Sequence, residues 1–382
     1  MRPTQLTQKT TMHRLLKNCA AALLLGSLAA GTQAQETAEK LGGQLRIYNW
    51  IEYLPKDVLQ QFRDETGVEI LYDVFDSPQT LEARLLTGTA GYDLAFPSSS
   101  QVPQLIAAGA LEPLKRQSLP HFSGLDASFM QQREPLDPGS RYSVPYLWGT
   151  TLIGFNKAKV DAALGTDSDM RDYDLLFKPE NIARLSKCGV AFLDSANEVI
   201  PIVLHYLGLD PNSSNPEDYA RAEKVLQSIR PYVRYFNSAK YPQDLANGDI
   251  CVALGWSGGM LAARNMAHAA DNGNDIRLAL PRQGTLMWSD DMVIPKGAKN
   301  VAQAHAFIDF LLRPEVIARV TNQIGYPNPT PASLPLVDPK LLGDHDLFVP
   351  DDQRHLLFQA EPPHKQALRQ LTRIWNRIRS SV

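Results

Sequence analysis

Apolar and polar residues alternate along this chain with two different periods. Short apolar runs bounded by Gly, Pro, Asn or Ser, such as 44–48, are typical of strands. Stretches whose apolar residues return three and four positions apart are typical of helices, and in 56–66 Val58 and Phe62 share one face. Gly67 follows as the residue that ends this helix. The two periods alternate from one end of the chain to the other, which predicts an α/β fold.

The same patterns give the expected order of elements. Strands are predicted at 44–48, 68–75, 93–96, 146–156, 189–192, 233–235, 250–254, 276–280 and 291–294. Helices are predicted at 56–66, 77–88, 197–207, 216–229, 241–247, 259–270 and 300–312. A further helix follows the strand at 93–96 and ends at 109, and two more lie near 353 and 365. Ser77 and Pro78 supply the N-cap and the first residue of their helix. This order implies a mostly parallel sheet with helices on both faces.

The length of 382 residues allows two lobes with separate hydrophobic cores. No flexible linker divides the chain, so we expect it to cross between the lobes more than once. We assign 35–147 and 268–315 to lobe 1, and 148–267 and 316–382 to lobe 2. The composition, 44% hydrophobic and 21% charged, is that of a globular protein.

Residues 1–34 have the pattern of a secretory signal peptide. Four basic side chains precede an apolar run at 19–30, and Thr32 and Ala34 are the small residues of a cleavage site. The apolar run is too short to span a bilayer in the mature protein. We therefore expect export to the periplasm.

Export changes the charge of the protein. Removing residues 1–34 leaves 34 basic side chains against 41 acids, a net charge of −7. A mildly acidic protein is not a nucleic-acid binder and suits a cationic ligand, although simple solubility explains the same charge. None of the eight His lies in a metal-ligand spacing, so we expect no metal and no cofactor.

The mature chain contains only two cysteines, Cys188 and Cys251. An even pair in an exported protein favours a disulfide, and two buried free thiols are the alternative. A disulfide would close a loop of about 60 residues, for which chain entropy gives roughly 4 kcal/mol of stabilisation.

Aromatic and acidic residues meet at the end of the first predicted strand. Trp50 and Tyr53 flank Glu52 there, and ligands of open α/β sheets bind in the crevice at such strand ends. A ring face and a carboxylate together suit a desolvated ammonium. The alternative is that both rings belong to the core and the acid is solvated. Similar clusters recur around Trp256, at Trp288 with Asp290, and at Tyr326.

One motif points to a different class of protein. Residues 255–259 match G-x-S-x-G after a strand and before a helix, the setting of a nucleophilic serine. Asp290 or Asp291 and His305 follow in the order that a serine hydrolase requires. However, no Gly-rich oxyanion loop precedes the motif, and His305 falls inside a predicted helix. We therefore expect no enzyme activity and no labelling of Ser257 by a serine-directed probe.

Longer stretches carry a resemblance to a known family. They are Ile47-Tyr48-Asn49-Trp50 with Glu52-Tyr53, Gly91-Tyr92-Asp93-Leu94 with Pro97-Ser98, Cys188-Gly189 with Phe192-Leu193-Asp194, and Leu245-Ala246-Asn247-Gly248-Asp249-Ile250-Cys251 with Gly255-Trp256. In these stretches the chain resembles the periplasmic binding proteins of ABC transporters for putrescine and spermidine, across essentially the whole mature sequence. The resemblance implies a periplasmic-binding-protein fold that closes by a hinge, a Cys188–Cys251 disulfide, and delivery of a polyamine to a membrane permease.

The resemblance also assigns roles to residues. Five aromatic side chains would line the ligand: Trp50, Tyr53, Trp256, Trp288 and Tyr326. Three acids would pair its charges: Glu52, Glu198 and Asp290. Ser98 would form a hydrogen bond. This set agrees with the physics of burial, because an unpaired ammonium inside a protein costs several kcal/mol.

Three positions depart from the pattern of the family. Ile51 replaces a small hydroxyl residue, Gly259 stands where putrescine binders carry Asp, and Ser195 stands where some spermidine binders carry Asp. Glu52 and Trp288 match the spermidine type, so the resemblance implies that spermidine binds at least as tightly as putrescine.

The sequence therefore predicts an exported polyamine-binding protein that acts as a monomer, binds no nucleic acid and docks transiently on an ABC permease. A periplasmic polyamine sensor for a signalling receptor would have the same fold, and the sequence leaves that alternative open.

Overall fold

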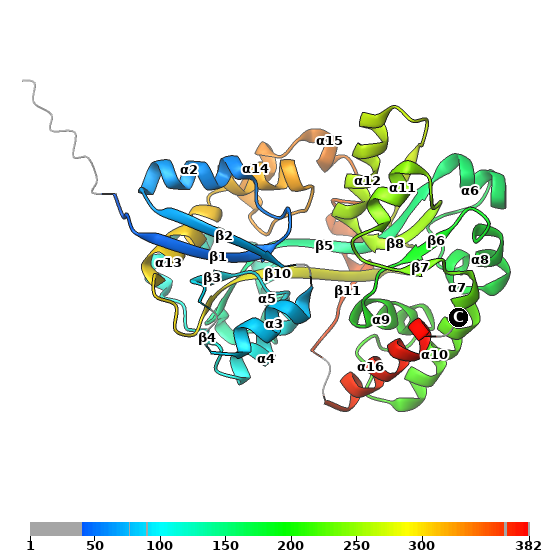
Figure 1. The fold of residues 1–382 in the computed structure, drawn as a ribbon, viewed down its shortest axis with the longest axis horizontal. Coiled ribbons are helices and arrows are strands. Elements are labelled where there is room, and N and C mark those ends of the chain that lie inside the picture. Colours follow the sequence, from blue (N-terminus) through cyan, green and yellow to red (C-terminus); the bar gives the residue numbers. More distant parts are fainter. Residues whose placement is uncertain (1–39, 76, 89–90, 363–364, 381–382) are drawn as a thin grey trace, which may run out of the picture. The chain divides into compact units, whose positions relative to one another are not determined.

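The apolar periods of the sequence correspond closely to the elements of the fold (Figure 1). The structure, a computed structural model, describes residues 40–75, 77–88, 91–362 and 365–380. The expected signal peptide lies outside these residues. Within them, no helix is both long enough and apolar enough to cross a membrane.

The strands and α-helices alternate along the chain, as expected. The strands are β1 (Gln44–Trp50), β2 (Glu69–Phe75), β3 (Leu94–Ala95), β4 (Leu111–Glu112), β5 (Ser143–Asn156), β6 (Val190–Phe192), β7 (Tyr235–Phe236), β8 (Val252–Trp256), β9 (Ile276–Ala279), β10 (Thr285–Pro295) and β11 (Leu357–Gln359). The α-helices are α2 (Lys56–Thr66), α3 (Pro78–Leu86), α4 (Val102–Ala107), α5 (Ala127–Arg133), α6 (Lys157–Leu164), α7 (Asp174–Phe177), α8 (Pro179–Leu185), α9 (Ala196–Tyr206), α10 (Pro216–Ile229), α11 (Tyr241–Asn247), α12 (Ser257–Ala270), α13 (Val301–Leu311), α14 (Pro314–Ile324), α15 (Pro339–Leu342) and α16 (Lys365–Ser380).

Local chemistry sets the ends of several helices. Gly67 adopts the left-handed conformation with φ of 70° and ends α2, because its backbone N–H reaches the carbonyl of Arg63. Ser77 accepts a hydrogen bond from the backbone N–H of Thr80 and begins α3, with Pro78 as its first residue. These ends confirm the predictions made from the same residues.

The strands form one mixed sheet in the order β2-β1-β3-β10-β5-β8-β6-β7. The outer pairs, β1 with β2 and β6 with β7, are parallel. The two long central strands, β5 and β10, pair antiparallel with each other, β10 also pairs antiparallel with β3, and β5 with β8. The parallel parts thus lie on either side of an antiparallel centre.

Two large groups of buried side chains lie at opposite ends of the central strands. One includes Val144 and Leu147 of β5 with Met292 and Ile294 of β10. The other includes Leu152 and Ile153 of β5 with Leu286 of β10. Each long strand therefore runs from one core to the other, and the middle of both strands lies between the cores (Figure 1).

Strand β10 is longer than its sequence indicates. The prediction began at 291, whereas the strand begins at Thr285, so that Trp288 and Asp290 lie within it and not before it. Thr, Ser and two Asp interrupt the apolar pattern of this segment. Their burial depends on partners from distant parts of the chain, which a local pattern does not contain.

Cys188 and Cys251 form a disulfide, with Cα atoms 5.4 Å apart and a sequence separation of 63. Cys188 lies between α8 and β6, and Cys251 directly precedes β8. The predicted pairing is confirmed, and the alternative of two free thiols is wrong.

Candidate functional site

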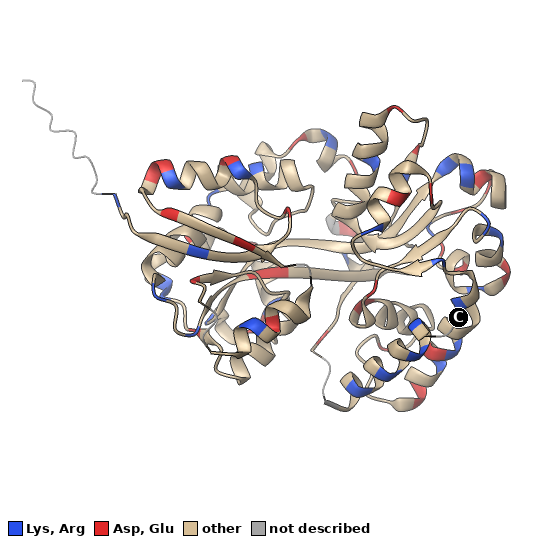
Figure 2. Cartoon of the chain, in the orientation of Figure 1, with Lys and Arg blue, Asp and Glu red and all other residues tan. Residues whose placement is uncertain are grey.

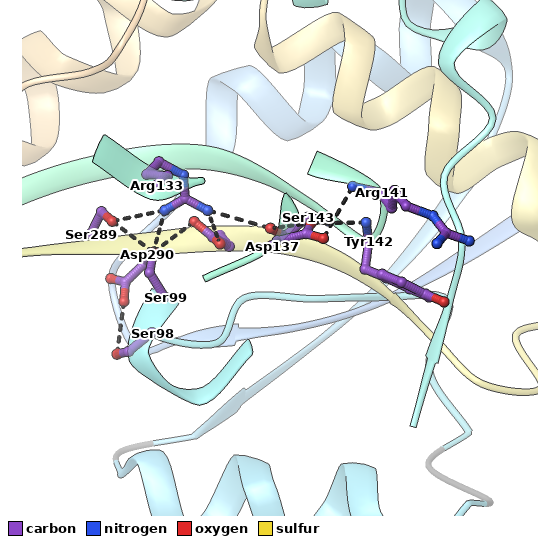
Figure 3. A network of polar contacts seen from close by, with 10 residues as sticks. Ser98, Ser99, Arg133, Asp137, Arg141, Tyr142, Ser143, Ser289 and Asp290 are labelled. Atoms are coloured by element: carbon purple, nitrogen blue, oxygen red, sulfur yellow. Dashed lines mark hydrogen bonds and ion pairs between the residues drawn. The ribbon is translucent and has the colours of Figure 1, made fainter. Parts of the chain in front are cut away.

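Asp290 occupies the middle of β10 and is 5% exposed. The Ser98 hydroxyl donates a hydrogen bond to Oδ1 of Asp290 at 2.9 Å, and the two residues form an isolated antiparallel bridge (Figure 3). The hydroxyl of Tyr53 also interacts with this carboxyl group. Three stretches that are far apart in the sequence therefore meet here.

Burial raises the pKa of Asp290 to about 7, and the nearby charges of Asp291 and Glu198 act in the same direction. The nearby hydroxyl of Tyr53 and the hydrogen bond from Ser98 oppose the rise without cancelling it. Asp290 is thus a buried acid that a nearby cation would ionise.

The next residue along the strand has the opposite environment. A bulge between Asp290 and Asp291 shifts the register of β10 against β5. Asp291 is fully buried and forms an ion pair with Arg133, the last residue of α5, which is 2% exposed. Ser99 donates to Oδ1 of Asp291 at 2.8 Å and accepts from Nη1 of Arg133 at 2.6 Å (Figure 3). Asp291 is therefore neutralised by the protein itself.

The second candidate acid, Glu198, lies in the first turn of α9. Its Oε2 accepts a hydrogen bond from the Thr151 hydroxyl at 2.6 Å, and the indole Nε1 of Trp256 lies 2.8 and 2.9 Å from its two oxygens. Burial raises the pKa of Glu198, while the hydrogen bonds from Thr151, Trp256 and Ser195 oppose the rise.

Three aromatic rings of the expected ligand set are in contact with one another. The rings of Trp288 and Tyr326 meet edge to face with centroids 4.9 Å apart, and those of Tyr326 and Tyr53 are 5.8 Å apart. Trp288 packs over Gly149, its partner on β5, where a Cβ atom would lie 2.5 Å from the indole ring. Burial raises the pKa of Tyr326, and the charges of Asp290 and Glu198 act in the same direction.

Two expected ligand residues are less closely connected to this group. Trp50 packs on Phe75 with ring centroids 4.5 Å apart and lies against the core. Glu52 is exposed and has a positive φ of 55°, a backbone conformation that is unusual for a residue other than Gly. Its carboxylate therefore lies in solvent beside Tyr53 in the chain, and the structure records no contact between it and the other acids.

Neither Asp290 nor Glu198 forms an ion pair with a basic side chain within the described residues. Strands β5 and β10 contain no Lys or Arg, and in Figure 2 the acidic part of β10 lies on an otherwise uncharged stretch. A buried carboxylate without a counter-ion is costly, so a cation of the right length would be stabilised between the two acids. The ring faces add cation–π attraction for the same ligand.

The geometry does not support a serine hydrolase. Ser257 begins α12, is buried, and accepts a hydrogen bond from the backbone N–H of Thr150 at 3.3 Å. His305 lies in α13, where its Nε2 accepts from the backbone of Lys115 and its Nδ1 bonds to the carbonyl of Val301. The candidate base is therefore engaged elsewhere, and the G-x-S-x-G match has another explanation.

Several residues around the site were missed from the sequence. Thr151 lies within a long apolar run, and Arg133 lies in an irregular stretch, so neither carries a periodic signal. Two adjacent Asp in a buried strand were the available clue, because a second buried acid requires a protein cation. Tyr241, which contacts Trp256, gave no signal beyond its place at the start of a helix.

Comparison with known proteins gives a consistent result. Residues 57–343 match the family model described as bacterial extracellular solute-binding protein. The chain is 43% identical over 364 residues to the putrescine/agmatine-binding protein of Pseudomonas aeruginosa, and the alignment covers 95% of this chain and 99% of that protein. It is 39% identical over 370 residues to the putrescine-binding periplasmic protein PotF of Escherichia coli, and this alignment covers 97% of this chain and 100% of PotF. The solved structure of the spermidine/putrescine ABC transporter substrate-binding protein PotD of Streptococcus pneumoniae has a TM-score of 0.75 at 25% identity, covering 88% of this chain and 98% of PotD.

Proposed function

Because the chain belongs to the bacterial extracellular solute-binding proteins, we propose that it captures a polyamine in the periplasm and delivers it to an ABC permease. Proteins of this family bind solutes and are not enzymes. The observation that carries the proposal is the pair of buried acids, Asp290 and Glu198, which lack basic partners in the described chain. Each acid has an aromatic residue beside it, Tyr53 at Asp290 and Trp256 at Glu198. A linear molecule with an ammonium at each end and methylenes between satisfies both features.

The ligand set comprises residues from the central strands and from both cores. It is Trp50, Glu52, Tyr53, Ser98, Glu198, Trp256, Trp288, Asp290 and Tyr326. Asp290 and Glu198 take the two terminal ammoniums, and the rings of Trp288 and Tyr326 line the methylene chain between them. Glu52, which is exposed, meets the ligand only when the site closes over it.

The arrangement of the two cores supports a closing motion. Tyr53 and Tyr326 belong to one core and helix α9 with Glu198 to the other, and strands β5 and β10 contribute to both. We propose that the cores are the two lobes and that β5 and β10 contain the hinge, because a ligand that contacts both sides stabilises the closed state. Small-angle scattering tests this: the radius of gyration should fall on saturation with ligand. An unchanged profile argues against a hinge.

The names of the relatives favour putrescine, while two residues of this chain favour a longer amine. Trp288 offers a large ring face, and Gly259 supplies no acid to the far end of a short diamine. We therefore propose that spermidine binds at least as tightly as putrescine.

Isothermal titration calorimetry with putrescine, spermidine and the uncharged analogue 1,4-butanediol tests the function and the ligand together. Both amines should bind and the diol should not. Asp290→Asn should weaken binding, whereas Asp275→Asn, at an exposed acid, should leave it unchanged. Equal binding of the diol, or no binding of any amine, would reject the polyamine assignment. A tenfold preference for putrescine, about 1.4 kcal/mol, would reject the order of the two amines only.

We also propose that the protein works as a monomer, because all proposed ligand residues come from one chain. Light scattering coupled to size exclusion, with and without ligand, should give the mass of a single chain. A ligand-dependent dimer would contradict this.

A further inference from the structure

The segment Gly255 to Gly259, which resembles a nucleophile motif, has a different use in this fold. A Cβ atom on Gly258 would lie 2.2 Å from the ring of Tyr326. A Cβ atom on Gly259 would lie 2.0 Å from the hydroxyl oxygen of Tyr241, and one on Gly255 would lie 2.7 Å from the same ring. No real Cβ atom approaches so closely, so the glycines are what allows two tyrosine rings to sit against this turn.

Tyr241 uses this space to hold Trp256. The Tyr241 side chain is 1% exposed, and its hydroxyl accepts a hydrogen bond from the backbone N–H of Trp256 at 3.1 Å. The same hydroxyl donates to the carbonyl oxygen of Trp256 at 3.3 Å. Burial raises the pKa of Tyr241 well above its usual value, so the group stays neutral and keeps its proton for the second bond. Both polar backbone atoms of Trp256 are thus bound by one side chain.

Trp256 in turn covers one edge of Glu198. Its Nε1 lies nearly equidistant from the two carboxylate oxygens, at 2.8 and 2.9 Å. That edge is where a guanidinium would place its two parallel N–H donors. The Thr151 hydroxyl takes a further position on Oε2 at 2.6 Å. A ligand can therefore reach this carboxylate at a single point, which an ammonium does and a forked guanidinium does poorly.

We propose that Tyr241 is a positioning residue that, seated against Gly259, fixes the Trp256 indole on the two-oxygen edge of Glu198 and so makes this end of the site select an alkyl ammonium over a guanidinium. The inference rests on the proposed function, because it concerns the same site. It adds the head group that this end accepts and a residue that does not touch the ligand.

The test compares three ligands built on the same four-carbon chain: putrescine, with two ammoniums; agmatine, with one ammonium and one guanidinium; and 1,4-diguanidinobutane, with two guanidiniums. Calorimetry on the wild type should give decreasing affinity in that order, since agmatine can still place its ammonium at Glu198. Tyr241→Phe keeps the ring and removes the hydroxyl. It should lower the putrescine affinity about fivefold to tenfold and reduce the preference for putrescine over 1,4-diguanidinobutane.

Two matched variants serve as controls. The first, Tyr219→Phe, removes the hydroxyl of another buried tyrosine, which lies in α10 and donates to the carbonyl of Ser213 at 2.8 Å; it should leave all three affinities unchanged. The second, Gly124→Ala, changes a glycine with nothing within 4 Å of an added Cβ and should have no effect.

The second control is matched to a further test variant, Gly259→Ala. This change should push the Tyr241 hydroxyl away and reproduce the effect of Tyr241→Phe.

The reduced preference is the outcome that a merely structural role would not produce, because loss of folded protein lowers all three affinities alike. If Tyr241→Phe does not fold, Gly259→Ala carries the test. The inference is overturned if both variants keep the wild-type order and ratio of affinities, or if the wild type prefers the diguanidine. A wild type that binds none of the three ligands overturns the proposed function itself, and the inference with it.

Discussion

Asp290 and Asp291 are neighbours on one strand, yet they belong to two regions with opposite electrostatics. On one side of β10, Asp291 is paired with Arg133 and bonded to Ser99, so that region is neutral without any ligand (Figure 3). On the other side, the hydroxyl groups of Ser98 and Tyr53 lie beside Asp290, and Thr151 and Trp256 donate hydrogen bonds to Glu198. The contrast teaches that Asp291 has a protein cation and needs no ligand, whereas Asp290 and Glu198 have none within the described residues and would be neutralised by the cationic ligand that we propose.

The largest expected effect comes from breaking the neutral region. Arg133→Met leaves Asp291 buried without a cation and should lower the free energy of unfolding by about 3–5 kcal/mol. The double variant Arg133→Met with Asp291→Asn should recover much of that loss, because no buried charge remains. Urea denaturation measures both.

Arg277→Met is the control for this change, since it breaks an ion pair with Asp275 in which both side chains are about half exposed, and it should cost less than about 1 kcal/mol. A loss for Arg133→Met as small as that of the control would mean that the two regions do not differ as described.

The region around Asp290 and Glu198 should respond to mutation in the opposite way. Asp290→Asn removes an acid that the unliganded protein does not neutralise, so stability without ligand should stay the same or rise. The affinity for putrescine should fall by about 2–5 kcal/mol, because one ammonium then has no carboxylate. Thermal unfolding and calorimetry on the same samples give the two numbers. A variant that loses stability and keeps its affinity would show that Asp290 is a structural acid.

The pH dependence sharpens the comparison further. Asp290 has a pKa of about 7 in the folded protein against a usual value of 3.8, so between these values the folded state holds a proton that the unfolded state has released. The contribution of this group to stability is therefore fully present at low pH and is lost as the pH rises through 7. A cation needs the carboxylate, so its affinity should rise with pH by up to about tenfold per unit below 7 and then level off.

Calorimetry in buffers of different ionisation enthalpy should show a proton released on binding near pH 6.5. The charges that raise the pKa of Asp290 are those of Asp291 and Glu198. The pKa of Glu198 is raised as well, so Asp290→Asn should flatten the profile without removing its slope entirely. A wild-type affinity that does not change between pH 5.5 and 7 would contradict the prediction.

The smallest effect is expected from Ser98→Ala. This change removes one hydrogen bond to Asp290 and should weaken putrescine binding by about 0.5–1.5 kcal/mol. Ser128→Ala breaks a similar bond, from Ser128 to Asp126 at 2.6 Å on the exposed surface, and should not alter binding. Equal effects of the two variants on putrescine binding would show that Ser98 does not belong to the site.

Much of this molecule could be predicted from its sequence, and the reasons differ from one element to another. Helices α2, α10 and α11 have the predicted ends. The local sequence specifies them: Gly67 and Gly248 end α2 and α11, and an N-cap Asn215 with Pro216 begins α10. The periplasmic-binding-protein fold implied by the resemblance is confirmed by the solved structures of related proteins. The boundaries of the two lobes stay a prediction.

A site residue could be predicted where its chemical type indicates a role. It could not be predicted where its role depends on how the strands are aligned with each other. Ser98 and Asp290 are paired across 192 positions of sequence, and the resemblance rather than any local pattern brought them together. Thr151 reaches Glu198 only because of the register of β5, and Tyr241 reaches Trp256 only because Gly255 and Gly259 leave space. Such contacts depend on distances between elements, which no periodicity encodes.

The disulfide constrains the two ends of the proposed site differently. Cys188 and Cys251 close a covalent ring that contains Glu198, and Trp256 follows directly after it, whereas Ser98 and Asp290 lie outside. Oxidation therefore restricts the unfolded conformations of the segment that carries Glu198 and places no such restriction on the segments that carry Ser98 and Asp290.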